Sequence, residues 1–122
     1  MLPVRTDERL AMNALNVNGM GIAVDQEGFL VNLEDWSEPV AEALAEAEGL
    51  SLETEHWEIL HLLREFYREF QLSPATRPLI KYTALKLGPD KGNSMHLNRL
   101  FKGTPAKLAA KLAGLPKPSN CI

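Results

Sequence analysis

The protein has 122 residues, 45% of them hydrophobic, so it is large enough to bury the core of one domain. Its formal net charge is −3 at pH 7, and its only cysteine has no partner in the chain, which excludes an internal disulfide. No apolar run reaches the length of a membrane span, and residues 1–8 lack the pattern of a signal peptide, so no membrane contact is expected. Because a free thiol persists in a reducing compartment, we expect a cytoplasmic protein.

The charges are distributed unevenly along the chain. Residues 1–75 hold four basic residues and 15 of the 16 carboxylates, whereas residues 76–122 hold nine basic residues and one carboxylate, Asp90. Such asymmetry is typical of a protein that binds a partner of opposite charge, either nucleic acid or an acidic protein face. It is equally typical of two parts of one fold that attract each other, and the sequence leaves both interpretations open.

The first predicted element is a β-hairpin at about residues 16–31. Apolar stretches lie on either side of the segment Asp25–Gly28, and Gly28 can supply the positive φ that a tight turn often needs. Because a lone hairpin is only marginally stable in water, we expect it to pack against helices.

Helix signals follow in the next part of the chain. Ser37 is a suitable N-cap and Pro39 is tolerated in a first turn, so a helix is predicted from there to a C-cap at Gly49. A second, longer helix is predicted from Thr54, and we expect its apolar face to form the centre of the core. The residues of that face are Trp57, Leu60, Leu63, Tyr67 and Phe70, with Ile59, Leu62 and Phe66 alongside.

Three further helices are predicted from their caps and terminating glycines or apolar spacing. Their expected ranges are 73–88, 93–101 and 104–114. The elements together predict a mainly α (α+β) fold of about five helices and one hairpin, in which residues 1–114 form the domain.

Residues 115–122 are predicted to form a separate, flexible C-terminal arm. Pro116 and Pro118 prevent continuation of the helix and keep the arm extended, so Leu115, Pro116, Lys117 and Pro118 are expected to position its tip. Eight residues at roughly 3.3 Å each span about 26 Å. That length suffices to place Cys121 in the cleft of another protein.

Cys121 is the candidate catalytic residue. A lone cysteine is more often a small core residue, but this one follows a proline-broken, polar segment next to the C-terminus. The thiolate is the reactive form, and the neighbouring C-terminal carboxylate disfavours it. Basic residues that could offset this effect, if the arm folds back, are Lys117, Arg99, Lys107 and Lys111. A single thiol can accept a sulfane sulfur as a persulfide and give it up to another thiol.

Neither a metal nor a cofactor is predicted. The soft donors His56, His61, His96 and Cys121 show no metal-binding spacing, and His56 and His61 are five apart, so they do not share a helix face. The sequence has no glycine-rich phosphate loop.

Several segments taken together resemble one known family. These segments are Asp25–Leu30, Glu55–Ile59 with Arg64, Phe66 and Tyr67 nearby, Ser73–Arg77, Leu100–Phe101, Pro105–Lys107 and Ala113–Ile122. In these segments the chain is similar to the DsrC/TusE family of sulfur-relay proteins, from about Leu15 onward. The resemblance implies a five-helix orthogonal bundle with an N-terminal hairpin, a flexible arm carrying the penultimate cysteine, and a role in cytoplasmic sulfur trafficking.

The resemblance favours the single-cysteine, TusE-like branch. Ala110 stands where we expect the second cysteine of two-thiol members. The implied activity is that of a sulfurtransferase, a persulfide carrier acting in a relay toward 2-thiolation of the tRNA wobble uridine. The implied partners are a TusBCD/DsrEFH-like sulfur donor complex and, as acceptor, a tRNA 2-thiouridine synthetase with its tRNA.

Three other functions remain open from the sequence. The first is a single-cysteine DsrC-like sulfur carrier in dissimilatory sulfur oxidation or sulfite reduction. The second is a regulatory module that binds nucleic acid through helices within residues 73–101, which would bind DNA in a salt-dependent way without Cys121. The third is an inert structural subunit.

Overall fold

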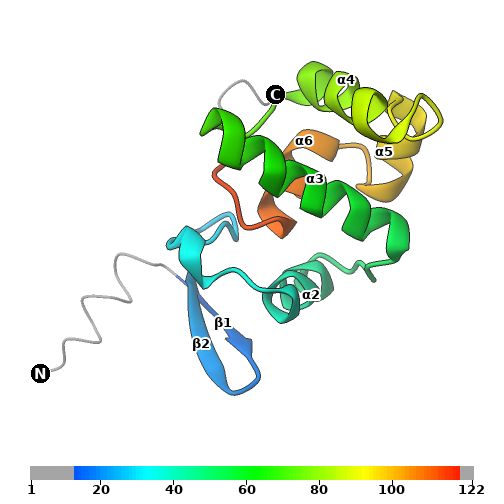
Figure 1. The fold of residues 1–122 in the computed structure, drawn as a ribbon. Helices are drawn as coiled ribbons and strands as arrows, with labels where there is room; N and C mark the ends of the chain where they lie inside the picture. Colours follow the sequence, from blue (N-terminus) through cyan, green and yellow to red (C-terminus); the bar gives the residue numbers. More distant parts are fainter. Residues whose placement is uncertain (1–12, 119–122) are drawn as a thin grey trace, which may run out of the picture.

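A computed structural model of the protein describes residues 13–118. Within this range a two-stranded antiparallel sheet precedes five α-helices (Figure 1). The elements are β1 (Asn13–Val17), β2 (Met20–Val24), the 3₁₀ turn η1 (Leu33–Asp35), α2 (Glu38–Ala47), α3 (Thr54–Phe70), α4 (Thr76–Leu87), α5 (Ser94–Leu100) and α6 (Pro105–Leu112). The predicted mainly α class with an N-terminal hairpin is confirmed. Between residues 13 and 118 we find no helix with the length and apolarity of a membrane span.

The tip of the β1–β2 hairpin lies at Asn18–Gly19, not at the predicted turn. Asn18 has φ 52° and Gly19 has φ 85°, and Val17 pairs with Met20 across the two-residue loop. Two central residues with positive φ form the turn whose twist matches paired strands, and Asn-Gly is the dipeptide that favours it. The hairpin was therefore predicted in about the right place with the wrong turn.

The predicted turn at Asp25–Gly28 does exist, but it follows the hairpin. The Asp25 carboxylate accepts hydrogen bonds from the N–H groups of Glu27 and Phe29, both at 2.9 Å. Gly28, with φ 93°, completes the turn, and Val24 then pairs with Leu30 in a single antiparallel bridge. The chain is thereby returned toward the helices with Phe29 and Leu30 buried.

The helix caps agree largely with the sequence signals. The Ser37 hydroxyl accepts from the N–H of Val40 at the start of α2, and Asn93 accepts from the N–H of His96 at the start of α5. The helix predicted from residue 73 instead begins at Thr76. The hydroxyl of Ser73 cannot cap it, because it is bonded to a distant part of the chain.

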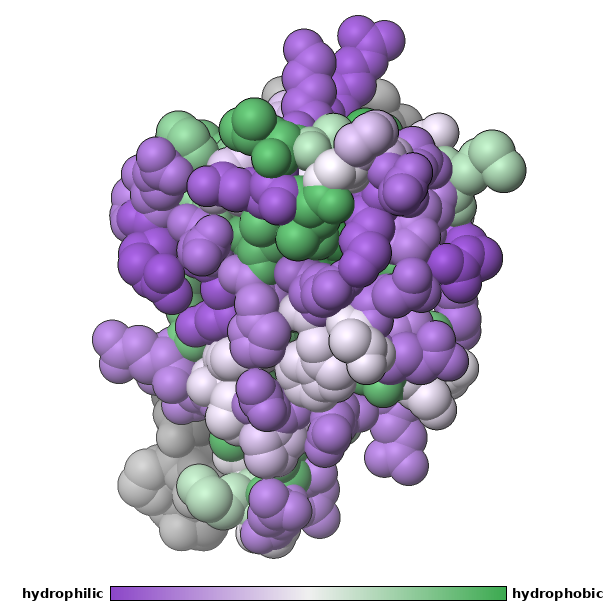
Figure 2. All heavy atoms as spheres, turned by 45° about the vertical axis from the view of Figure 1, so that its right-hand side comes forward, coloured by the Kyte–Doolittle hydropathy of each residue, from purple (hydrophilic) through white to green (hydrophobic). Residues whose placement is uncertain are grey.

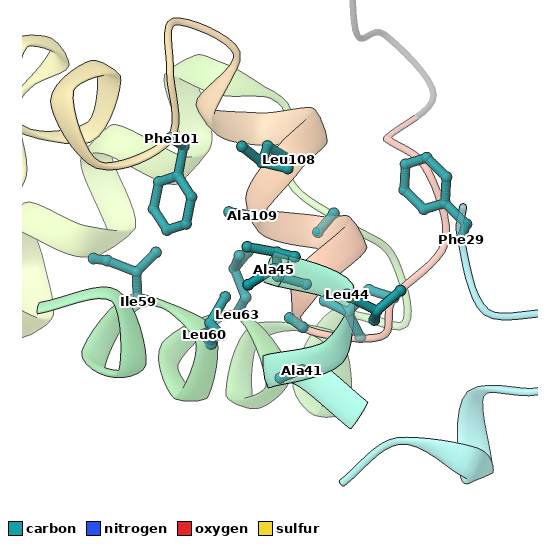
Figure 3. Packing of buried hydrophobic residues seen from close by; sticks show 14 of the residues in the cluster. Phe29, Ala41, Leu44, Ala45, Ile59, Leu60, Leu63, Phe101, Leu108 and Ala109 are labelled. Carbon is teal, nitrogen blue, oxygen red and sulfur yellow. The ribbon is translucent and has the colours of Figure 1, made fainter. Parts of the chain in front are cut away.

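The core forms where α6 crosses the other helices. The face of the molecule shown in Figure 2 is mostly hydrophilic, whereas Ala109, Ala110 and Leu112 of α6 are fully buried. α6 contacts α2, α3, α4 and α5. Small alanine side chains let α2 and α3 approach α6 closely, and Phe101 and Ile59 point toward one another beside it (Figure 3). The apolar face of α3 lies in this core as predicted. The helix that contacts each of the other four, however, is α6.

One buried polar side chain joins two of these helices. His56, near the start of α3, accepts from the N–H of Glu53 through Nδ1 and lies 2.9 Å from the carbonyl oxygen of Leu100 through Nε2. Both ring nitrogens are therefore bonded within the fold, and the ring also packs edge-on against Phe101. This pattern indicates a structural histidine, as a buried polar group needs partners.

Candidate functional site

The candidate site is the root of the C-terminal arm, since Cys121 itself lies outside the described residues. We define the root as residues 112–118, which lead from the last turn of α6 toward the cysteine. Of the residues predicted to position the arm, Leu115, Pro116, Lys117 and Pro118 all belong to it. Leu115 is only 2% exposed and forms part of the core, and Pro118 is also buried. The described part of the predicted arm thus packs on the domain.

The chain turns sharply as it leaves α6. Gly114 has φ 74°, its N–H donates to the carbonyl of Lys111, and the N–H of Leu115 donates back to the carbonyl of Ala110. A left-handed glycine followed by such a backward bond is a common helix ending, usually with an apolar contact just beyond it. Here that contact is the burial of Leu115, which sets the direction of the arm.

Two side chains from other elements bind the last carbonyls of α6. The indole Nε1–H of Trp36 donates to the carbonyl of Leu112 at 2.9 Å, and Nη1 of Arg64 donates to the carbonyl of Ala113 at 2.7 Å. The Arg64 guanidinium also lies over the Trp36 ring, 4.1 Å from its centroid. Because the final carbonyls of a helix lack partners within it, these donors stabilise the point where the arm begins.

Burial affects the charge of Arg64. Desolvation, and secondarily the charge of Arg68, lower the pKa of Arg64 below its ordinary value. An arginine remains protonated at neutral pH even so, and its charge strengthens the bond to the Ala113 carbonyl. We call Trp36 and Arg64 together the clamp.

Gly114 fits against the clamp because it lacks a side chain. A Cβ atom at this position would overlap the Trp36 ring, and its positive φ is strained for any other residue. The site therefore requires glycine for two independent reasons.

Two more contacts hold the root farther along. The hydroxyl of Ser73, in the loop before α4, donates to the carbonyl of Pro116 at 2.5 Å. Lys117 lies 3.2 Å from the carboxylate of Glu27, which also pairs with Lys107 at 3.3 Å. The hydrogen bond from Lys117, followed by that from Lys107, lowers the pKa of Glu27 below its ordinary value.

These contacts shorten the reach of the cysteine. If the root stays attached up to Pro118, Cys121 is only three positions beyond that proline, a span of about 10 Å at full extension. The predicted reach of about 26 Å requires release of the whole root.

The basic residues proposed to support the thiolate have carboxylate partners. Lys111 pairs with Glu48 at 2.7 Å and is 11% exposed, whereas Arg99 pairs with Glu55 of α3 at 3.3 Å. The structure brings Lys107 and Lys117 together on Glu27 but places Arg99 and Lys111 in separate ion pairs. Their influence on Cys121 stays a prediction.

The remaining sequence candidates have structural surroundings. Ala110, where a second cysteine was expected, has no exposed surface. His61 lies 3.5 Å from Glu38 and packs on Trp36 and Trp57. Within residues 13–118, no three histidine, cysteine or acidic side chains are grouped as metal ligands would be.

The sequence did not identify Trp36 as a residue of the site, and Ser73 and Arg64 entered only among the residues that resemble the family. The hydrogen bonds of Trp36, Ser73 and Arg64 to the root span 76, 43 and 49 residues, respectively, so no local pattern could reveal them.

Comparison with known proteins identifies the family. The family model described as DsrC like protein matches residues 16–122, which include Cys121. The chain is 54% identical to Sulfurtransferase TusE of Escherichia coli, covering 85% of this chain and 95% of the relative, and 48% identical to the Sulfurtransferase TusE homolog of Haemophilus influenzae, covering 88% and 99%.

Solved structures agree. DsrC of Allochromatium vinosum matches with a TM-score of 0.82 and 48% identity over 90% of this chain and 98% of that one. The oxidized gamma-subunit of dissimilatory sulfite reductase (DsrC) from Archaeoglobus fulgidus matches with a TM-score of 0.78 and 38% identity over 89% and 99%. From its fold and these matches, the chain belongs to the DsrC family.

Proposed function

We propose that this protein is a sulfurtransferase that carries sulfur as a persulfide on Cys121 and passes it on toward 2-thiolation of the tRNA wobble uridine. The observation that carries the proposal is the match to the family over residues 16–122, which takes in the only thiol of the chain, together with 54% identity to a sulfurtransferase TusE. The root supports it, because its contacts fix the place on the domain from which the chain continues toward Cys121.

The transfer consists of two thiol–persulfide exchanges. In the first, the Cys121 thiolate attacks the outer sulfur of a donor persulfide, the donor's S–S bond breaks, and the donor thiolate leaves with the electron pair. In the second, an acceptor thiolate attacks the outer sulfur of the Cys121 persulfide, and Cys121 leaves as the thiolate. Each step forms one S–S bond and breaks one, so no external oxidant or reductant is needed.

The chain needs partners on both sides of this relay. With Cys121 as its only thiol, it cannot resolve the persulfide internally and must hand the sulfur to another protein. We propose a TusBCD/DsrEFH-like complex as donor and a tRNA 2-thiouridine synthetase with its tRNA as acceptor, all acting in the cytoplasm.

A second candidate is a DsrC-like carrier in dissimilatory sulfur oxidation or sulfite reduction. Its support is the 48% identity and TM-score of 0.82 to the DsrC of Allochromatium vinosum. Ala110 weighs against a two-thiol mechanism, because it leaves Cys121 without an internal partner.

Mass spectrometry of the intact protein tests the proposal. After incubation with a persulfide donor, the wild-type chain should gain one sulfur and Cys121→Ser none. The loaded protein should then lose that sulfur to a purified tRNA 2-thiouridine synthetase and support thiolation of its tRNA. An unmodified wild-type chain would exclude the carrier function. Loading without transfer to the synthetase would favour the second candidate.

A further inference from the structure

The ion pairs of the structure divide the basic residues of the second half into two groups. Five of them bind carboxylates from the acidic part of the chain: Lys91 with Glu58, Arg99 with Glu55, Lys111 with Glu48, and both Lys107 and Lys117 with Glu27. Lys102 donates to the backbone carbonyl of Glu48. For this group, attraction within the fold accounts for the charge asymmetry of the sequence.

The second group lies on α4. Arg77, Lys81 and Lys86 form no ion pair with residues 13–118, and α4 itself contains no acidic residue. Arg77 and Lys81 are exposed, while Lys86 lies 5.5 Å from the centroid of the Tyr82 ring. Arg77 also occupies the first turn, where the helix dipole disfavours a positive charge. Lys86, in contrast, lies in the last turn, where the dipole favours a positive charge. Helix stability therefore does not explain the charges of Arg77 and Lys81.

An exposed apolar side chain lies among these cations. Leu85 is 78% exposed, and the spacing of Arg77, Lys81 and Leu85 at intervals of four residues places them along one stripe of α4. A face with charges around an apolar contact is typical of a protein interface.

This face begins where the arm leaves the domain. Ser73, which binds the Pro116 carbonyl, precedes the first residue of α4 by three positions. This hydrogen bond holds Pro116 beside the loop that leads into α4. A protein bound to α4 therefore lies close to the part of the root that precedes Cys121.

We propose that the outer face of α4, formed by Arg77, Lys81, Leu85 and Lys86, docks an acidic, partly apolar surface of a protein that exchanges sulfur with Cys121. This inference rests on the proposed function and adds the surface through which a relay partner is recognised. Complementary charge steers such a partner and fixes its orientation, and Leu85 supplies an apolar contact at the interface. An RNA partner is less well matched, because an exposed leucine offers nothing to a phosphate backbone.

Paired double variants test the docking face. Arg77→Gln/Lys81→Gln removes two unpaired charges from α4, whereas Lys91→Gln/Lys102→Gln removes two charges elsewhere and serves as the matched control. Binding of each variant to the purified donor complex and to the purified synthetase without tRNA is measured by calorimetry at low and physiological salt. We expect the α4 variant to bind at least one partner about tenfold more weakly at low salt, with the control close to wild type. Leu85→Ser should weaken the same partner at both salt concentrations.

Loading of Cys121 by inorganic polysulfide separates this inference from the proposed function. Both double variants should accept one sulfur from polysulfide like the wild type, since the small donor needs no docking face. Unchanged affinity of the α4 variant for both proteins would overturn the docking proposal while leaving the carrier function intact. Loss of binding to fluorescent tRNA alone, with both protein affinities unchanged, would also overturn it and assign the face to RNA.

Discussion

The root of the arm and the outer face of α4 are neighbours that use their polar groups in opposite ways. At the root, the clamp, Ser73 and Glu27 bind backbone carbonyls and a lysine of the same chain. On α4, Arg77 and Lys81 point their charges at solvent without a carboxylate among the described residues. The polar side chains around the root are bonded within the fold and fix the root on the domain. The charges of Arg77 and Lys81 are left available to a partner.

Because of this difference, substitutions in the two regions should affect different properties: those at the root affect stability, and those on α4 affect partner recognition. Substitutions at the root should lower the free energy of unfolding, because they leave buried groups unpaired or crowded. Substitutions on α4 should leave stability nearly unchanged, because exposed charges contribute little to it. Three changes at the root probe the first half of this comparison.

The largest effect is expected for Gly114→Ala. The new Cβ would overlap the Trp36 ring, and the positive φ of 74° adds strain, so we expect a loss of about 3 kcal/mol in the free energy of unfolding. Urea denaturation followed by circular dichroism measures it. Gly103→Ala is the matched control, since Gly103 also has positive φ but open space around it, and should cost only about 1 kcal/mol. Equal losses at the two positions would show that the clamp does not crowd the root.

A smaller effect is expected for Arg64→Leu. Removing the guanidinium leaves the carbonyl of Ala113 without its donor and should cost about 2 kcal/mol. The same substitution at exposed Arg68 should change stability by less than about 0.5 kcal/mol. Amide exchange of Leu115, whose N–H bonds to Ala110, should also become faster in Arg64→Leu. Unchanged exchange would mean that Arg64 stabilises α3 without holding the root.

The smallest effect is expected from pH at Glu27. Hydrogen bonds from Lys117 and then Lys107 hold the pKa of Glu27 below its ordinary value of 4.5. Its contribution to stability is therefore present above that ordinary value and is lost as the pH falls through the lower pKa of the folded state. Stability measured between pH 3 and 6 (a range of about three units around the carboxylate pKa) should fall less steeply in Glu27→Gln than in the wild type. Identical slopes would contradict a role for this pair at the root.

The sequence predicted most of the fold because its signals are local. Ser37 and Asn93 cap helices by bonding the backbone three residues ahead, and Gly88 and Gly114 end helices through their own φ. The observed hairpin turn has a local signal too, since Asn18–Gly19 is a dipeptide that favours a two-residue hairpin turn, whereas Gly28 belongs to the turn after the hairpin.

The site was less predictable because its contacts are distant. Cys121 and the prolines of the arm follow from position in the chain, but Leu115 was assigned to the arm although its side chain belongs to the core. Only the folded structure reveals that Trp36, Arg64 and Ser73 meet residues 112–116. The ion pairs of Lys107 and Lys111 were equally hidden, because they depend on which helices become neighbours.

The bond from Ser73 to the Pro116 carbonyl has a consequence for partner choice. It fixes Pro116 on the domain, so as long as the bond holds, only the residues that follow Pro116 can extend into a partner. A partner whose reacting sulfur lies near the mouth of its own cleft can exchange sulfur with Cys121 while the root stays attached. A partner with a deeper sulfur must first detach Leu115 from the core, and its binding free energy is reduced by that amount. The depth of the reacting sulfur in the partner's cleft thus affects which partner binds well, independently of the partner's charge.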